Sequence, residues 1–218
     1  LADLPEADSR TTEDDENNLE AARAAIEKLN DTDPQRRFYL FTRSRVYVRG
    51  DGLWRGWERK RGALMELAGL LRGRKTGLIC AAGDRDALDG TQFILTLDTD
   101  TILTPGAARS LIGAMLHPLN APVIDKKRGM VTSGYGLLHP RIATDLKSAV
   151  ATDFTRIFAG AGGMDVYGPA GGELFMDRYD CGGFAGKGIL SIDALLTCCG
   201  KAIPENRVLS HDALEGAY

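Results

Sequence analysis

The sequence lacks a long uninterrupted apolar run and a strong surplus of either charge. A membrane-spanning helix needs about 20 consecutive apolar residues, and no stretch approaches that length. The 27 basic and 30 acidic residues give a formal net charge of −3, which does not favour a nucleic acid as partner. The N-terminus has neither the basic region nor the apolar core of a signal peptide. These absences favour a soluble enzyme or binding domain.

Cysteine is also scarce. Four cysteines are present, without C-x-x-C spacing or a disulfide framework, and two of them are adjacent: Cys80, Cys181, Cys198 and Cys199. This pattern fits a reducing compartment.

Length and composition are those of one large α/β domain. The chain has 218 residues, of which 44% are hydrophobic and 26% charged, enough to bury a core. We expect a single domain over residues 1–218, with an acidic loop over 1–16 and a glycine-rich loop over 159–183. The chain begins without Met in an acidic segment, so we also expect a piece of a longer protein, incomplete at both ends.

Apolar spacing predicts alternating helices and strands. Helices are expected after residue 16, over 57–71, after Pro105, over 143–158 and over 191–199. Strands are expected at 38–42, 45–48, 78–81, 93–97 and 130–138. Three of these helices have defined apolar faces. They are formed by Leu19, Ala22, Ile26 and Leu29 in the first, by Leu64, Leu67, Ala68 and Leu71 in the second, and by Ala108, Leu111, Ile112 and Met115 in the third.

The segment FILTLDTDTIL places two carboxylates, Asp98 and Asp100, directly after a buried strand. Ligands of open α/β sheets lie beyond the carboxyl ends of the strands, so chemistry is expected at this edge. Two enzyme classes use such a pair. Nucleotide-sugar transferases hold the donor ribose and a divalent metal with Asp-x-Asp, and haloacid-dehalogenase-type phosphatases use Asp-x-Asp-x-Thr as nucleophile and acid.

The phosphatase alternative assigns Asp98 as nucleophile and Asp100 as acid. Ser133, Lys187 and Asp212 would complete its site. Almost a hundred residues precede the Asp pair, however, whereas the nucleophile strand of such phosphatases normally lies near the start of the domain.

The transferase alternative accounts for more of the chain. WERKRGALMEL resembles the Lys-x-Gly-Ala-Leu-Asn helix start of inverting glycosyltransferases, in which Lys60 and the helix amides face the nucleotide, although Met65 replaces the Asn. LSHDALEG supplies a further acid, Asp212, where these enzymes carry their catalytic base.

Several strings together resemble one family. GWERKRGALMEL, LTLDTDTILTPGAARSLIGAMLHPLNAPV, GYGLLHPR, FTRIFAG, FAGKGI and IPENRVLSHDALEG are similar, in order, to the glycosyltransferase domain of cyclic β-1,2-glucan synthases, glycosyltransferase family 84. The resemblance implies a GT-A fold, Rossmann-like, with a mostly parallel central sheet flanked by helices. It also implies UDP-glucose as donor, Mg²⁺ or Mn²⁺, a glucan acceptor, and a place within a large multidomain protein at the cytoplasmic face of the bacterial inner membrane.

The resemblance also assigns roles to residues. Asp98 would contact the donor nucleoside, Asp100 the metal, and Asp212 would be the catalytic base. Lys60 would lie near the diphosphate.

The turn of Gly186, Lys187 and Gly188 would approach the donor or acceptor sugar. Trp57 or Phe184 could stack on a sugar, although core packing is the commoner role of an aromatic side chain. The remaining alternative is a non-catalytic platform that keeps the fold and the nucleotide pocket.

Overall fold

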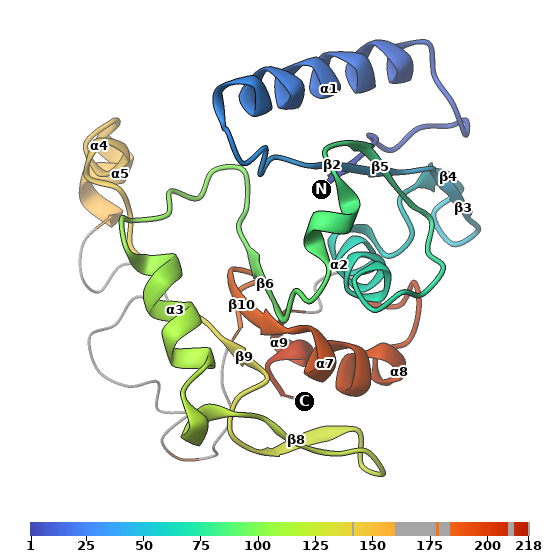
Figure 1. Ribbon diagram of the computed structural model, residues 1–218. Helices are drawn as coiled ribbons and strands as arrows, with labels where there is room; N and C mark the ends of the chain where they lie inside the picture. The colour runs from blue at the N-terminus through green and yellow to red at the C-terminus, as the bar shows by residue number, and fades with distance from the viewer. Residues whose placement is uncertain (141, 160–177, 179–183, 209–211, 218) are drawn as a thin grey trace. The chain divides into compact units, whose positions relative to one another are not determined.

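The computed structural model describes residues 1–140, 142–159, 178, 184–208 and 212–217 (Figure 1). The chain groups into two compact units. Unit 1 comprises Leu1–Gln92 and Gly200–Leu209, and unit 2 comprises Phe93–Cys199 and Ser210–Tyr218. Each unit is described by itself, and the expectation of one domain over residues 1–218 stays a prediction.

The sheet of unit 1 has the strand order β1-β2-β5. Its central strand β2 (Leu40–Arg43) pairs in parallel with β1 (Ala2–Asp3) and antiparallel with β5 (Leu78–Ala82). Helix α1 (Asp14–Thr32) contacts β2 and β5, and helix α2 (Arg59–Leu70) contacts β5 (Figure 1). The sheet and α2 enclose the core of this unit, in which Phe41, Leu70 and Leu78 are buried together.

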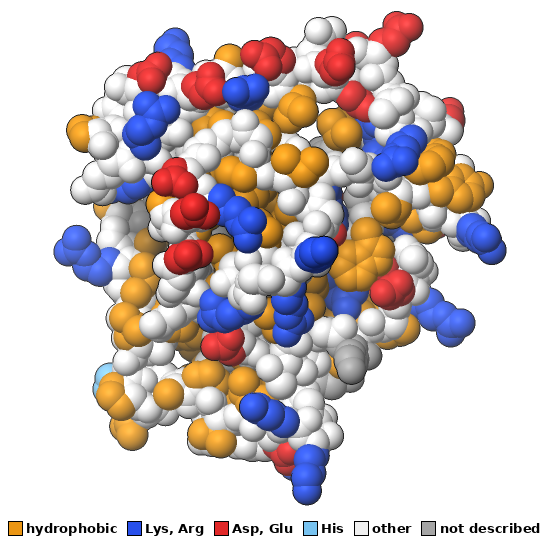
Figure 2. Space-filling view, turned by 45° about the vertical axis from the view of Figure 1, so that its right-hand side comes forward, with side chains coloured by type: hydrophobic (Ala, Val, Ile, Leu, Met, Phe, Trp, Pro, Cys, Tyr) orange, Lys and Arg blue, Asp and Glu red, His pale blue; other side chains and the backbone are white. Residues whose placement is uncertain are grey.

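The elements predicted for unit 1 form, with shifted ends. The strand predicted from residue 38 begins at Leu40, because the side chain of Asn30 exchanges hydrogen bonds with the backbone N–H and carbonyl of Phe38. On α1, Leu19, Ala22 and Ile26 are half-buried, but Leu29 is 43% exposed. Figure 2 shows acidic and basic side chains along the exposed face of α1.

Two details of unit 1 differ from expectation. The acidic segment 1–16 is not all loop, since Ala2–Asp3 pairs with β2 and α1 begins at Asp14. A hairpin joins the predicted strand β3 (Val46–Val48) to β4 (Leu53–Arg55), a strand that the sequence analysis missed. Gly50, Asp51 and Gly52 lie in the turn of this hairpin.

The sheet of unit 2 is antiparallel. Its central strand β10 (Gly188–Ser191) pairs with β6 (Phe93–Thr96) on one side and β9 (Leu137–Leu138) on the other. All four residues of β10 are buried. The sequence analysis did not predict β10, because its Gly-Lys-Gly start is typical of a turn and Ser191 of a helix start.

Helix α3 (Ala107–Met115) packs against β10 and β9. Met115 is buried and Ala108 and Leu111 are half-buried, as an inward face requires. Ile112 is 43% exposed, so its predicted inward position is wrong.

The other predicted elements of unit 2 are interrupted. The strand expected at 130–138 divides into β8 (Met130–Ser133), which forms a hairpin with β7 (Val123–Asp125), and β9. The helix expected at 143–158 divides into α4 (Leu146–Ala149) and α5 (Asp153–Phe158). The second division occurs at Thr152, whose hydroxyl accepts the Thr155 N–H and starts a new helix.

The remaining elements are short. Helical turns form at η1 (Arg85–Leu88), η2 (Pro118–Asn120), α7 (Ile192–Ala194), the π-helical η3 (Leu195–Cys199), α8 (Gly200–Ala202) and α9 (Asp212–Glu215). Among the described residues, Cys80, Cys198 and Cys199 are not in disulfides. Cys181 and almost all of the glycine-rich loop predicted at 159–183 lie outside the described residues.

The described residues form a mixed α/β structure with small sheets. The predicted mostly parallel central sheet is not found among them, because β1–β2 is parallel whereas the other pairings of the described strands are antiparallel. Short apolar runs predict strands but not their direction, which is why the sequence did not reveal this. The GT-A assignment stays a prediction. Along the same stretches, no helix is both long and apolar enough to cross a membrane.

Candidate functional site

The candidate site in unit 2 lies where β6 ends and β10 begins. Thr96, the last residue of β6, pairs with Gly188, the first residue of β10. The buried Thr96 hydroxyl lies 3.1 Å from the Gly186 carbonyl oxygen and 3.2 Å from that of Gly188, and donates its proton between them. This contact fixes the Gly186–Lys187–Gly188 turn beside the loop that carries Asp98 and Asp100.

Both glycines of this turn are required by their surroundings. Gly186 has φ +70°, a left-handed conformation that favours glycine. A Cβ on Gly188 would lie 2.4 Å from the carbonyl oxygen of Leu138 on β9. The turn is therefore held by β6 on one side and β9 on the other, and only the side chain of Lys187 is left to move.

An ion pair joins this turn to the first predicted acid. Lys187 Nζ lies 2.7 Å from Asp98 Oδ2, and the two side chains are 24% and 37% exposed. The hydrogen bond to Asp98 is the main cause that raises the pKa of Lys187 above its usual value. Partial burial opposes the rise, and the charges of Asp98, Asp100 and Asp212 add to it.

The third predicted acid packs against the same turn. Asp212 is the first residue of α9 and is half-buried. A Cβ on Gly186 would lie 2.9 Å from Asp212 Oδ1, so the carboxylate rests against the bare Cα of this glycine. The structure thus brings Asp98, Lys187, Gly186 and Asp212 together, with Asp100 on the exposed side of the same loop.

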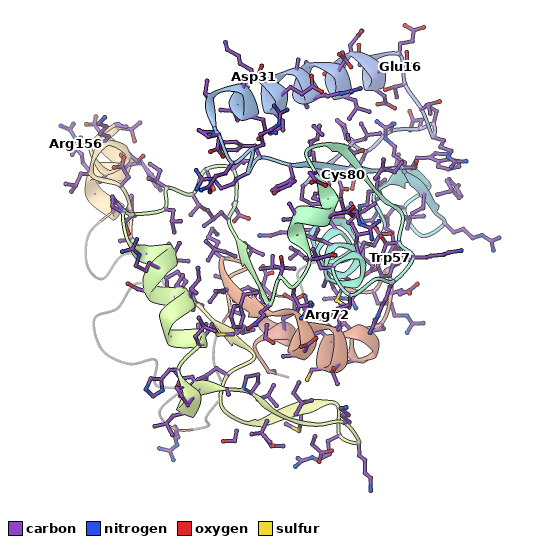
Figure 3. The ribbon with its side chains drawn as sticks, viewed as in Figure 1. Glu16, Asp31, Trp57, Arg72, Cys80 and Arg156 are labelled. Carbon is purple, nitrogen blue, oxygen red and sulfur yellow. The ribbon has the colours of Figure 1, made fainter. Side chains whose placement is uncertain are left out.

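Lys60 belongs to unit 1, where it is half-buried on α2. Its predicted approach to the diphosphate stays a prediction. The glycine of the Lys-x-Gly-Ala-Leu pattern has a structural reason, because a Cβ on Gly62 would lie 1.8 Å from the carbonyl oxygen of Trp57. Trp57 lies two residues before α2 (Figure 3) and is half-buried.

Two other basic residues close to Lys60 in the sequence are held in ion pairs within unit 1. Arg55 and Arg61 are buried and pair with Asp51 and Glu58, at 2.6 Å and 2.8 Å. Likewise Phe184 is only 2% exposed, so it packs in the core of unit 2 rather than against a sugar. The sequence pattern alone did not separate these structural charges and aromatics from functional ones.

The predicted divalent metal would need ligands from the described acidic, histidine or cysteine side chains. Within the described parts of the chain, no three His, Cys, Asp or Glu side chains form a ready-made metal site. Mg²⁺ is commonly bound through one or two carboxylates together with substrate phosphates and water, so Asp98 and Asp100 fit that kind of site. Their role as ligands stays a prediction.

Sequence reasoning missed two polar residues near the site. Thr96 fixes the Lys187 turn, and Glu215, on α9 three residues after Asp212, is 4% exposed. The place of Thr96 at the end of the strand before Asp98 was a usable signal. Ser133, required by the phosphatase alternative, is exposed at the end of β8.

Comparison with known proteins gives one informative similarity. The chain is 39% identical, over 223 aligned positions that cover its whole length, to a segment of the cyclic beta-(1,2)-glucan synthase NdvB of Rhizobium meliloti (strain 1021). The chain spans 8% of the length of that protein. No family model matches the chain.

Proposed function

We propose that this chain is an inverting glucosyltransferase domain that transfers glucose from UDP-glucose to a growing β-1,2-glucan. It would be of family 84 and the GT-A kind, within a cyclic β-1,2-glucan synthase at the cytoplasmic face of the bacterial inner membrane. The observation that carries the proposal is the cluster of unit 2, in which Asp98, Asp100 and Asp212 act on the ammonium of Lys187. The similarity to the synthase segment covers the whole chain and therefore the stretches that carry these residues.

The cluster suits transfer with inversion. Asp212 takes the proton of the acceptor 2-hydroxyl while that oxygen forms a bond to the anomeric carbon of the donor. The bond from this carbon to the UDP oxygen breaks at the same time, and its electron pair leaves with UDP. Asp98 holds the nucleoside side of the donor, and Lys187 offers its ammonium to the diphosphate as charge develops there.

Asp100, with Asp98 beside it, would hold Mg²⁺ or Mn²⁺. When bound, the cation neutralises negative charge on the diphosphate. Asp98, Asp100 and Asp212 carry more negative charge than the ammonium of Lys187 balances, which is the electrostatic reason to expect a cation there.

The phosphatase alternative uses the same Asp98, Asp100 and Lys187, and a non-catalytic platform would keep them for binding alone. The full-length similarity to a glucan synthase segment favours the transferase over the phosphatase.

Calorimetry of UDP binding, with and without Mn²⁺, separates the three candidates. For the transferase we expect UDP binding that requires Mn²⁺ and is lost in Asp100→Asn. Asp89→Asn, an exposed carboxylate of unit 1, is the matched control and should bind as the wild type does. Aspartyl-phosphate at Asp98 after incubation with phosphate analogues would support the phosphatase. Metal-dependent binding without glucosyl transfer by the intact synthase would support the platform.

A further inference from the structure

The Lys187–Asp98 ion pair occupies a carboxylate that the proposed metal site needs. The ammonium lies 2.7 Å from Asp98 Oδ2, which is hydrogen-bond distance. Its positive charge balances part of the negative charge of the loop. A divalent cation on the same carboxylate would be placed next to the ammonium. Two like charges at such a distance repel each other, so the ammonium on Asp98 weakens the binding of a cation there.

The turn allows the ammonium to leave without moving the backbone. Thr96 holds the carbonyls on both sides of Lys187, and Gly188 is packed against Leu138. Lysine carries its charge on a flexible four-carbon stem. The Lys187 side chain can therefore change partner while Asp98 and the turn stay in place.

We propose that Lys187 competes with the divalent cation for Asp98 and gives way to it when a nucleoside diphosphate offers the ammonium a new partner. This inference rests on the proposed function and deepens it. It makes metal and nucleotide binding mutually dependent. The metal binds weakly while Lys187 holds Asp98, and it binds tightly once the diphosphate has drawn the ammonium away.

The test is Mn²⁺ affinity without nucleotide, measured by electron paramagnetic resonance on the 218-residue chain. Lys187→Gln should bind Mn²⁺ about fivefold more tightly than the wild type, the lower end of common couplings between bound groups. Lys187→Arg, which keeps the charge, should stay near the wild type. Lys126→Gln, in the exposed β7–β8 turn, is the matched control for the loss of one positive charge.

A second measurement repeats the titrations with saturating UDP. The wild type should gain Mn²⁺ affinity with UDP, and Lys187→Gln should gain less, because its Asp98 has no ammonium to release. Circular dichroism and urea unfolding identify any variant that has not folded. If Lys187→Gln has not folded, Lys187→Met replaces it.

The outcomes distinguish this inference from the proposed function. If UDP binding by the wild type needs Mn²⁺ but Lys187→Gln binds Mn²⁺ no better without nucleotide, the competition is overturned and the function stands. If UDP binding needs no metal yet Lys187→Gln still gains Mn²⁺ affinity over Lys126→Gln, the function is overturned and the competition stands. If UDP binding needs no metal and Lys187→Gln binds Mn²⁺ no better than the wild type, the competition and the proposed function are both overturned.

Discussion

The two units use charge in opposite ways. In unit 1, buried guanidinium groups are matched by carboxylates: Arg43 bonds Asp3 and Glu66, and Arg45 bonds Asp15. In unit 2, three carboxylates act on the half-buried Lys187, and these four charges leave a negative surplus. Charge balanced in the interior holds a fold together, whereas surplus charge near solvent is available for a cation or a substrate.

The functional role of the carboxylates in unit 2 is tested most severely at Asp212. In the intact synthase, Asp212→Asn should lower the rate of glucosyl transfer by about 10²- to 10⁴-fold, because a catalytic base acts in the transition state. UDP affinity should stay within about twofold of the wild type. Rate assays with UDP-glucose and calorimetry with UDP measure the two quantities, with Asp89→Asn as control. Parallel losses of rate and affinity would show that Asp212 has another role.

The stabilising role of the buried ion pairs in unit 1 is tested at Arg61. Arg61→Met removes the cationic partner of Glu58, both being buried, and also a contact with the Ile203 carbonyl. An uncompensated buried charge should lower the free energy of unfolding by about 3–5 kcal/mol in urea titrations.

The control is Arg23→Met, which breaks an exposed i,i+4 pair with Glu27 and should cost less than about 0.5 kcal/mol. The double variant Arg61→Met/Glu58→Gln should recover part of the loss. Similar values for Arg61 and Arg23 would contradict the structural role.

Two helical glycines separate backbone contact from helix propensity. In Gly62→Ala the new Cβ meets the Trp57 carbonyl at 1.8 Å, so we expect a loss of about 1–3 kcal/mol in the free energy of unfolding. In Gly113→Ala on α3 nothing lies within 4 Å of the new Cβ, so we expect a gain of about 0.5–1 kcal/mol. Thermal and urea unfolding measure both. Equal signs would mean that α2 does not start as described.

The smallest effect concerns pH. The Arg37 side chain, with the Arg37 N–H, lowers the pKa of Asp33 from 3.8 to about 2. A carboxyl with a lowered pKa stabilises the fold above pH 4, and this contribution is lost as the pH falls toward 2. The stability difference between wild type and Asp33→Asn should therefore shrink over that range in urea titrations. A difference that stays constant down to pH 2 would contradict the low pKa.

Much of the local structure could be predicted from the sequence. Apolar spacing located α1, α2, α3, β2, β5 and β6, because the period of the apolar residues follows from which face of an element is buried. Asp98 and Asp100 were singled out by their place after β6, and Asp212 by its place in LSHDALEG. The strand β10 and its antiparallel pairing could not be found, since Gly-Lys-Gly has a turn composition and its strand conformation depends on partners about 50 and 90 residues away. The burial of Arg55 and Arg61 was likewise a tertiary effect.

The central place of β10 has a consequence for biosynthesis. Its partners β6 and β9 both precede it in the chain, and it inserts between them (Figure 1). During synthesis, β6 and β9 therefore emerge before the strand that pairs with their backbone groups. Residues 93–138 can complete this sheet only once β10 has been made. The loop of Asp98 gains its lysine only after that insertion, so the ion pair of Asp98 with Lys187 is expected to be among the last contacts that the nascent chain forms.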